Sequence, residues 1–173
     1  TIDRPIYIAV NGTRTAHTKV VYSEIEIVNH SSLLKHDRVR EILLYYGIEN
    51  HIEIASFSDI PTKGTGLGSS STFTVGLLKA ILEMSKTQYN NYELAELACH
   101  IEIEKCNQPI GKQDQYAAAF GGFNAITFEG NDATVIPINI TTDTASRLND
   151  NLICFNTGIT RQASSILEDQ VKG

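Results

Sequence analysis

The chain has 173 residues, with 42% hydrophobic and 20% charged side chains, which is the composition of a folded globular protein and excludes a disordered or fibrous one. Its formal net charge of −6 leaves no broad basic surface for nucleic acid, so an anionic ligand would need a local site. No apolar run approaches the roughly 20 residues of a membrane span, and the first residues do not form a signal peptide. These features predict a cytoplasmic protein that binds neither nucleic acid nor membrane.

Hydrophobic periodicity predicts one α+β domain over residues 1–173. Residues 19–28 alternate as a strand would, and residues 37–46 have helical spacing that ends at Gly47, a residue suited to a helix C-terminus. Three cysteines without a CxxC pair predict reduced thiols and no cysteine metal site. In chain order we expect strands at 5–10, 19–28, 51–57, 123–128, 133–138 and 152–155. We expect helices at 37–46, 69–84, 92–106, 113–120 and 163–171.

Residues 61–71 read PTKGTGLGSSS and lead directly into the predicted helix at 69–84. Alternating glycines let backbone N–H groups approach a ligand, serines add hydroxyl donors, and a helix N-terminus favours negative charge. These are the requirements of a phosphate-binding loop. The Walker pattern fails because no Lys follows Gly68, and the Rossmann pattern fails because Ser69 stands where a glycine is required. A flexible loop followed by a serine N-cap is the structural alternative.

The string Gly-Leu-Gly-Ser-Ser-Ser at 66–71, preceded by Pro61, resembles the central motif of the GHMP superfamily, named for galacto-, homoserine, mevalonate and phosphomevalonate kinases. The resemblance implies an N-terminal domain of the ribosomal protein S5 domain 2 type, with a mixed β-sheet packed against helices. It also implies ATP and Mg²⁺ as cofactors, with Ser70 nearest the metal. The implied nucleotide-binding residues are Lys63, Gly64, Thr65, Gly66, Leu67, Gly68, Ser69, Ser70 and Ser71.

Glu102 lies near the centre of the apolar face of the predicted helix at 92–106. A buried carboxylate is costly, so it calls for a cation, a strong donor or a break in the helix. A metal is one such partner, and pairing with Lys105 in a partly exposed last turn is the plainer alternative. The resemblance favours Glu102 as a Mg²⁺ ligand because it precedes Asp114 at a compatible distance. Glu104, on the polar face, is the competing candidate.

Asp114 falls in the first turn of the predicted helix at 113–120, after a Pro/Gly turn. Stabilisation of the helix dipole is the plain interpretation of an Asp there. The segment also resembles the Gly-x-x-Asp-Gln segment of galactokinase-like members, which implies that Asp114 accepts the proton of the sugar hydroxyl. An Asp of ordinary low pKa would suffice, because phosphoryl transfer depends mainly on positioning and charge neutralisation.

The run at 109–122 and the string NTGITR at 156–161 are similar to the D-glycero-D-manno-heptose 7-phosphate kinases, which phosphorylate the anomeric hydroxyl. This resemblance implies substrate contacts from Gly111 and Arg161, although a solvated surface arginine is the alternative for Arg161. The family's N-terminal substrate motif and its C-terminal ferredoxin-like domain fall outside the chain, which puts efficient turnover by the chain alone in doubt. A fucokinase-like or other small-molecule kinase, a non-catalytic nucleotide-binding or assembly module, and a homodimer all remain open.

Overall fold

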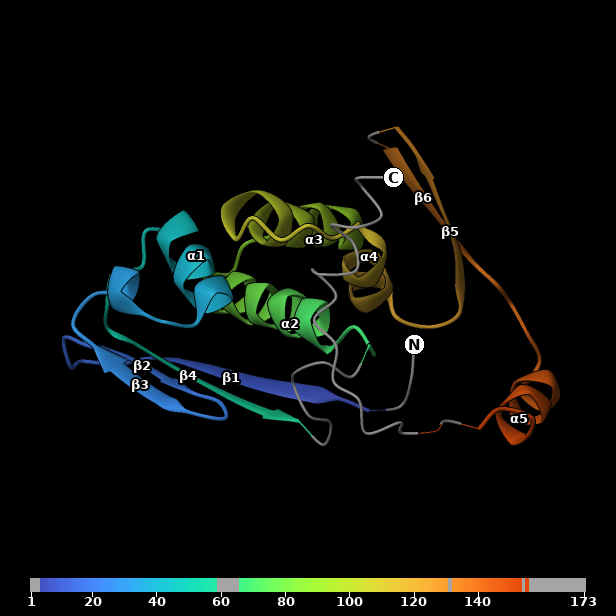
Figure 1. Cartoon of the computed structure of the whole chain (residues 1–173), viewed down its shortest axis with the longest axis horizontal. Coiled ribbons are helices and arrows are strands. Elements are labelled where there is room, and N and C mark those ends of the chain that lie inside the picture. Colours follow the sequence, from blue (N-terminus) through green and yellow to red (C-terminus); the bar gives the residue numbers. More distant parts are fainter. Residues whose placement is uncertain (1–3, 59–65, 131, 154, 156–173) are drawn as a thin grey trace.

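The computed structural model describes residues 4–58, 66–130, 132–153 and 155, and its main sheet has four strands in the order β1-β4-β2-β3 (Figure 1). Strand β4 is parallel to β2 and antiparallel to β1, while β2 and β3 form an antiparallel pair. The sheet is therefore mixed, as the resemblance implied. Its strands are β1 (Ile6–Gly12), β2 (Thr18–Val21), β3 (Ile25–Val28) and β4 (Ile52–Ser58).

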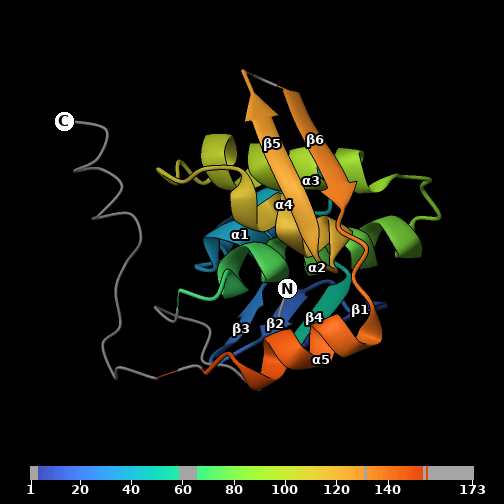
Figure 2. The same cartoon turned by 90° about the vertical axis from the view of Figure 1, so that its right-hand side faces the viewer.

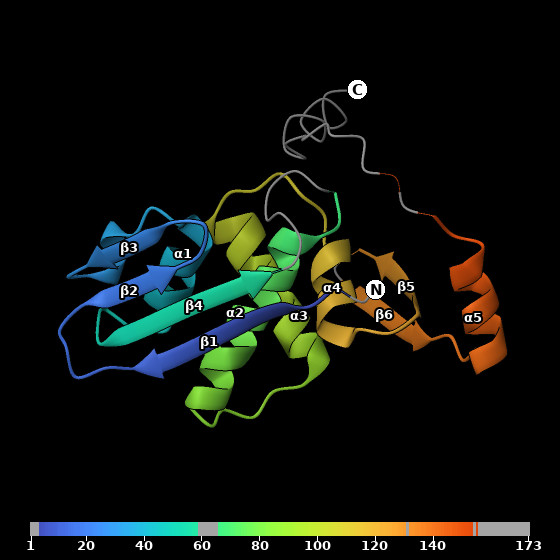
Figure 3. The same ribbon diagram turned by 90° about the horizontal axis from the view of Figure 1, so that it is seen from below.

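Helices cover one face of this sheet, so the domain has a layer of strands below a layer of helices (Figures 1 and 3). A 3₁₀ turn η1 (Ser31–Leu33) precedes α1 (Asp37–Tyr45). The long helix α2 (Ser69–Met84) runs along the sheet, and α3 (Asn91–Cys99) and α4 (Gln113–Phe120) pack against it. The bounds of α2 and α4 are those the sequence predicted.

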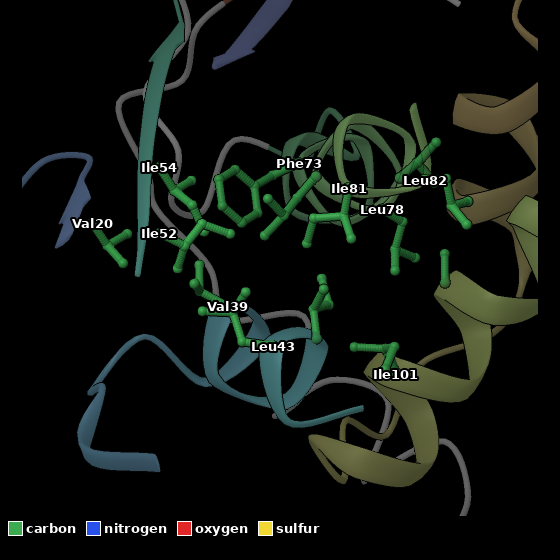
Figure 4. Packing of buried hydrophobic residues seen from close by; sticks show 14 of the residues in the cluster. Val20, Val39, Leu43, Ile52, Ile54, Phe73, Leu78, Ile81, Leu82 and Ile101 are labelled. Atoms are coloured by element: carbon green, nitrogen blue, oxygen red, sulfur yellow. The ribbon is translucent and has the colours of Figure 1, made fainter. Parts of the chain in front are cut away.

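The core lies between the sheet and these helices (Figure 4). Ile52 and Ile54 point from β4 toward Val39 of α1 and Phe73 of α2, and Ile101 closes the far side. Burial of such side chains stabilises the fold by about 1.5–3 kcal/mol each. Because α2 is buried along most of its length, the end of the glycine-rich loop is attached to a rigid element.

The predicted helix at 92–106 forms, but in two parts. Regular α-helix ends at Cys99, and a π-helical turn, η2 (His100–Lys105), continues to the end. The N–H of Cys106 donates to the carbonyl of Ile101, five residues earlier, at 2.9 Å. Such wide turns are rare in proteins, and those that occur often lie at functional sites. Here the wide turn contains Glu102.

The single strand predicted at 19–28 is wrong, because the chain turns between Val21 and Ile25 to give β2 and β3. The N–H of Tyr22 donates to the carbonyl of Glu24 at 2.8 Å and closes the turn. The turn is held by Glu26, whose buried carboxylate accepts from the Tyr22 hydroxyl at 2.9 Å and from the N–H of Lys35 at 2.6 Å. The alternation of side chains continues through residues 21–25, so the sequence pattern gave no sign of a turn there.

A second antiparallel hairpin, β5 (Asn124–Glu129) and β6 (Asp132–Pro137), stands beside α3 and α4 (Figure 2). It packs there through Phe128, whose ring meets the ring of Tyr116 edge-on, with 5.4 Å between the ring centroids. Helix α5 (Thr142–Asp150), which the sequence did not predict, follows it and buries none of its residues. Its start is capped by the Thr141 hydroxyl, which accepts from the N–H of Thr144 at 3.2 Å.

The strand predicted at 152–155 does not form among the residues described there. Leu152, Ile153 and Phe155 lie outside any strand and are strongly exposed. The helix predicted at 163–171 lies outside the described residues. Within the described part of the chain, no helix is both long and apolar enough to cross a membrane.

Two described cysteines, Cys99 and Cys106, are free thiols. Burial raises the pKa of each to about 12. Since the thiolate is the reactive form, we expect both to resist alkylation in the folded protein and to react fully after denaturation. Mass spectrometry of peptides after a short iodoacetamide pulse checks this. Labelling of Cys99 in the native protein as fast as in urea would contradict the packing described here.

Candidate active site

The glycine-rich loop ends in two glycines with left-handed backbone conformations. Gly66 has a φ of 69° and Gly68 a φ of 67°, values that favour glycine strongly. Gly68 caps the N-terminus of α2, and its carbonyl accepts from both the N–H and the hydroxyl of Thr72 at 3.0 and 2.9 Å. Leu67 between them is exposed. The predicted ligand residues Lys63, Gly64 and Thr65 lie outside the described residues.

Glu102 is fully buried, with 0% of its side chain exposed, as its place on the apolar face predicted. The wide turn of η2 directs it toward the first two turns of α2. Oε2 accepts from the Ser71 hydroxyl at 2.7 Å, and Oε1 accepts from the Thr74 hydroxyl at 2.9 Å. The Ser70 hydroxyl lies farther from Oε1, at 3.5 Å. The two residues predicted to share a metal, Ser70 and Glu102, are therefore neighbours.

The cation beside Glu102 is Arg38, which sequence reasoning missed. Its Nε donates to Oε1 of Glu102 at 2.7 Å, from a side chain that is 18% exposed. Glu104 lies outward, with a side chain that is 67% exposed, and pairs with His100 Nδ1 at 2.9 Å. Glu102 thus takes its ion pair from α1 rather than from Lys105. No feature of the sequence signalled this contact, because Arg38 lies 64 residues away.

Asp114 and Gln115 leave the start of α4 in different directions. Gln115 is buried and its Nε2 donates to Oε2 of Glu102 at 2.6 Å, while its Oε1 is buried without a partner. Asp114 faces the loop, since a Cβ built on Gly68 would lie 3.3 Å from its Cγ. The structure therefore brings the end of the glycine-rich loop, the buried carboxylate and the predicted base together.

The pKa of Asp114 is raised above its usual value, first by partial burial of the carboxyl group and second by the nearby charge of Glu102. An ordinary low pKa, which the sequence argument took as sufficient for a proton acceptor, is thus not what Asp114 has. A general base is more effective when its pKa lies closer to neutrality, provided that it is still ionised at the working pH. The raised pKa thus makes Asp114 a better proton acceptor than an aspartate of ordinary pKa.

Gly111 and Lys112, which come just before α4, do not join this group. Lys112 donates to both oxygens of Glu96 at 3.1 Å, and the Tyr116 hydroxyl donates to the same carboxylate. Gly111 is exposed, and a Cβ on it would meet nothing within 4 Å. Arg161 lies outside the described residues. Lys112 is thus engaged in an ion pair with Glu96 of α3.

The oxygen atoms near the loop suit a magnesium ion, which prefers oxygen ligands and keeps several waters. Among the described residues, however, no group of three or more His, Cys, Asp or Glu side chains is arranged to hold a metal. The hydroxyl of Ser71, a predicted phosphate ligand, is buried against Glu102. A metal held by Ser70 and Glu102 would therefore need further oxygen atoms from a bound nucleotide.

A methyl group at Gly68 tests the contact between the loop and Asp114. We expect Gly68→Ala to lower the affinity for nucleotide and any turnover, because it adds left-handed strain of about 1–2 kcal/mol and pushes on Asp114. Gly66→Ala is the matched control, with the same backbone strain and open space around its Cβ. Equal nucleotide affinities of the two variants, measured by calorimetry, would show that Asp114 does not depend on the close approach.

Comparison with known families identifies this arrangement. Residues 33–122 match the model of the GHMP kinases N terminal domain, which is more than half of the chain, so the chain belongs to the GHMP kinase family. It is 43% identical over 119 residues to D-glycero-alpha-D-manno-heptose 7-phosphate kinase of Campylobacter jejuni subsp. jejuni serotype O:2. That match covers 68% of this chain and 34% of the relative.

Solved structures give the same fold. A D-glycero-D-manno-heptose 1-phosphate kinase from Bacteroides thetaiotaomicron matches with a TM-score of 0.75 and 28% identity, over 84% of this chain and 52% of that one. A putative sugar kinase from Campylobacter jejuni matches with a TM-score of 0.71 and 29% identity, over 84% and 48%. The chain thus spans about a third of the curated relative and about half of each of these structures.

Proposed function

We propose that the chain is the ATP-binding part of a sugar kinase that phosphorylates the anomeric hydroxyl of D-glycero-D-manno-heptose 7-phosphate, giving the 1,7-bisphosphate and ADP in the cytoplasm. The observation that carries the proposal is the position of Asp114 against Gly68, where a helix N-terminus, a glycine-rich loop and the Asp114 carboxylate meet. Residues 1–173 would form one domain of that enzyme. The 43% identity to the heptose 7-phosphate kinase supports this sugar over others.

In this proposal, the loop and the first turn of α2 bind the triphosphate. The first N–H groups of a helix have no partner within it and carry a partial positive charge, so they favour phosphate oxygens. The nucleotide-binding residues are those at 63–71, and Ser70 and Glu102 would hold Mg²⁺. The ion would neutralise charge on the β- and γ-phosphates during transfer.

Asp114 would orient the sugar. The anomeric oxygen forms a bond to the γ-phosphorus while the bond from that phosphorus to the bridging oxygen of ADP breaks. The hydroxyl proton passes to the Asp114 carboxylate, whose raised pKa suits it to accept that proton. Gly111 and Arg161 are proposed to contact the sugar phosphate, Arg161 through the planar fork that suits phosphate.

The test is ADP release on a panel that includes heptose 7-phosphate, heptose 1-phosphate and L-fucose, with full-length protein and with this chain alone. The proposal predicts release that depends on heptose 7-phosphate. Preference for fucose would point to a fucokinase-like enzyme, and preference for heptose 1-phosphate to the activity named for the Bacteroides structure. Nucleotide binding by calorimetry with no turnover of any sugar would instead indicate a non-catalytic module.

A further inference from the structure

The carboxylate of Glu102 is saturated by protein donors. Oε1 accepts from Arg38 and Thr74, and Oε2 accepts from Ser71 and Gln115, at 2.6–2.9 Å. An ionised carboxylate offers about four lone-pair sites, so these four short bonds fill it, and the Ser70 hydroxyl at 3.5 Å from Oε1 is a longer, fifth contact. A metal ion that binds to Glu102 therefore has to take the place of one of these four donors.

Arg38 is the donor whose place a cation would take. It alone among these donors is charged, so it and a metal ion at the same oxygen would repel each other. Ser71 and Thr74 belong to the buried face of α2, and Gln115 is fully buried in α4. Arg38 instead reaches in from α1 and remains 18% exposed, so it can leave without opening the core.

A second acceptor for Arg38 is already in place. Its Nη1 lies 3.4 Å from Oδ1 of Asp37, a side chain that is 37% exposed. The guanidinium carries five N–H donors in a fixed fork, so it can strengthen this contact as it gives up Glu102. The exchange would leave neither Arg38 nor Glu102 without an opposite charge.

We propose that Arg38 is an exchangeable counter-ion that neutralises Glu102 in the metal-free protein and transfers to Asp37 when a nucleotide-bound divalent cation takes its place. The proposal rests on the proposed function, because it assumes that a metal–nucleotide complex binds beside Ser70. Its consequence is that Arg38 weakens metal binding while it holds the empty site together. Arg38 is therefore a positioning residue that sets the metal requirement of the enzyme.

The experiment measures Mn²⁺ affinity by electron paramagnetic resonance in full-length protein saturated with a non-hydrolysable ATP analogue. Arg38→Met removes the competing charge and keeps the apolar stem, so we expect Mn²⁺ to bind more tightly by on the order of tenfold, a common size for coupling between two ligands. Arg38→Lys keeps the charge and should stay near the wild-type affinity. Unchanged or weaker Mn²⁺ binding by Arg38→Met would overturn the proposal.

Thermal unfolding gives a readout that does not need turnover. Without metal, Arg38→Met should melt below the wild type, because Glu102 is left without its cation. With Mn²⁺ and the analogue it should gain more in melting temperature than the wild type, because tighter binding stabilises the folded state more. An equal gain in both proteins would contradict the exchange.

Asp37→Asn decides the case if Arg38→Met does not fold. It leaves the Arg38–Glu102 pair intact but weakens the alternative acceptor, so Mn²⁺ affinity should fall several-fold, within the range of ordinary coupling. Glu41→Gln, which removes the acid paired with Arg40 on the same helix, is the matched control and should leave the Mn²⁺ affinity unchanged. Unchanged Mn²⁺ affinity in Asp37→Asn would overturn the proposed transfer of Arg38 to Asp37.

Wild-type protein that binds no ATP analogue would refute the proposed function. Analogue binding with equal Mn²⁺ affinities in the wild type and the variants would refute only the role of Arg38 as an exchangeable counter-ion.

Discussion

Asp114→Asn should lower sugar-dependent ADP release by about 10²–10⁴-fold, the usual contribution of a positioned general base, while nucleotide affinity stays close to wild type. Asparagine keeps the size of the side chain against Gly68 but cannot accept the hydroxyl proton. Steady-state kinetics and calorimetry on the full-length protein measure the two effects. A rate within a factor of a few of wild type would remove Asp114 from the chemistry.

The control for this change is Asp143→Asn, because Asp143 occupies the same second position in the first turn of α5. Both substitutions remove a charge that favours a helix dipole, so a shared effect would be structural. We expect the rate to be unchanged in Asp143→Asn. A comparable loss of rate in both variants would support the dipole interpretation of Asp114.

Asp114→Asn should also melt at a temperature no lower than wild type at neutral pH. Because the pKa of Asp114 is raised in the folded state, that state binds its proton more tightly than the unfolded chain does. The tighter proton binding stabilises the folded state fully at a pH below the pKa of Asp114 in the unfolded chain. This stabilisation is lost as the pH rises through the pKa of Asp114 in the folded protein. The advantage of the variant should therefore shrink as pH falls through that window, which thermal melts across pH would show.

Glu102→Ala should destabilise the fold by about 3–5 kcal/mol, the usual cost of removing one partner of a buried ion pair. The substitution removes the acceptor of Arg38 Nε and leaves the Ser71 hydroxyl and the Gln115 amide without the carboxylate they bond in the core. Urea unfolding measures the loss. This is the largest effect on stability that the structure predicts for a single site residue.

Glu104→Ala is the control, since it removes an exposed carboxylate from the same π-helical turn. Exposed ion pairs contribute about 0–1 kcal/mol, so we expect a small change in stability. In a cycle with Arg38→Met, the double variant should lose less stability than the sum of the single ones, because each single change already breaks the Arg38–Glu102 ion pair. Additive losses, or a Glu102→Ala variant as stable as Glu104→Ala, would contradict the buried network.

The elements of the site with strong local signals were predictable from the sequence. Helices α2 and α4 begin after a glycine and after a Pro/Gly turn, so their starts are fixed by local chemistry. The burial of Glu102 followed from its place among apolar side chains at helical spacing. Thr74 was missed although it follows Ser70 by one helical turn, a spacing that places both on one face.

The contacts between distant segments were not predictable. Arg38 reaches Glu102 from a different helix, and nothing in the spacing of either residue points to the other. The sequence argument allowed a metal, a donor or a break in the helix for Glu102, and the structure supplies a cation, several donors and a π-helical turn at once. The turn between β2 and β3 was hidden because apolar and polar residues alternate through it.

The most direct test of the account is a crystal structure of the full-length protein with Mg²⁺ and a non-hydrolysable ATP analogue. The account predicts phosphate oxygens within hydrogen-bond distance of the backbone N–H groups at 66–71, and the Asp114 carboxylate facing the γ-phosphate. A nucleotide bound away from the start of α2, or an Asp114 carboxylate turned away from its terminal phosphate, would contradict it.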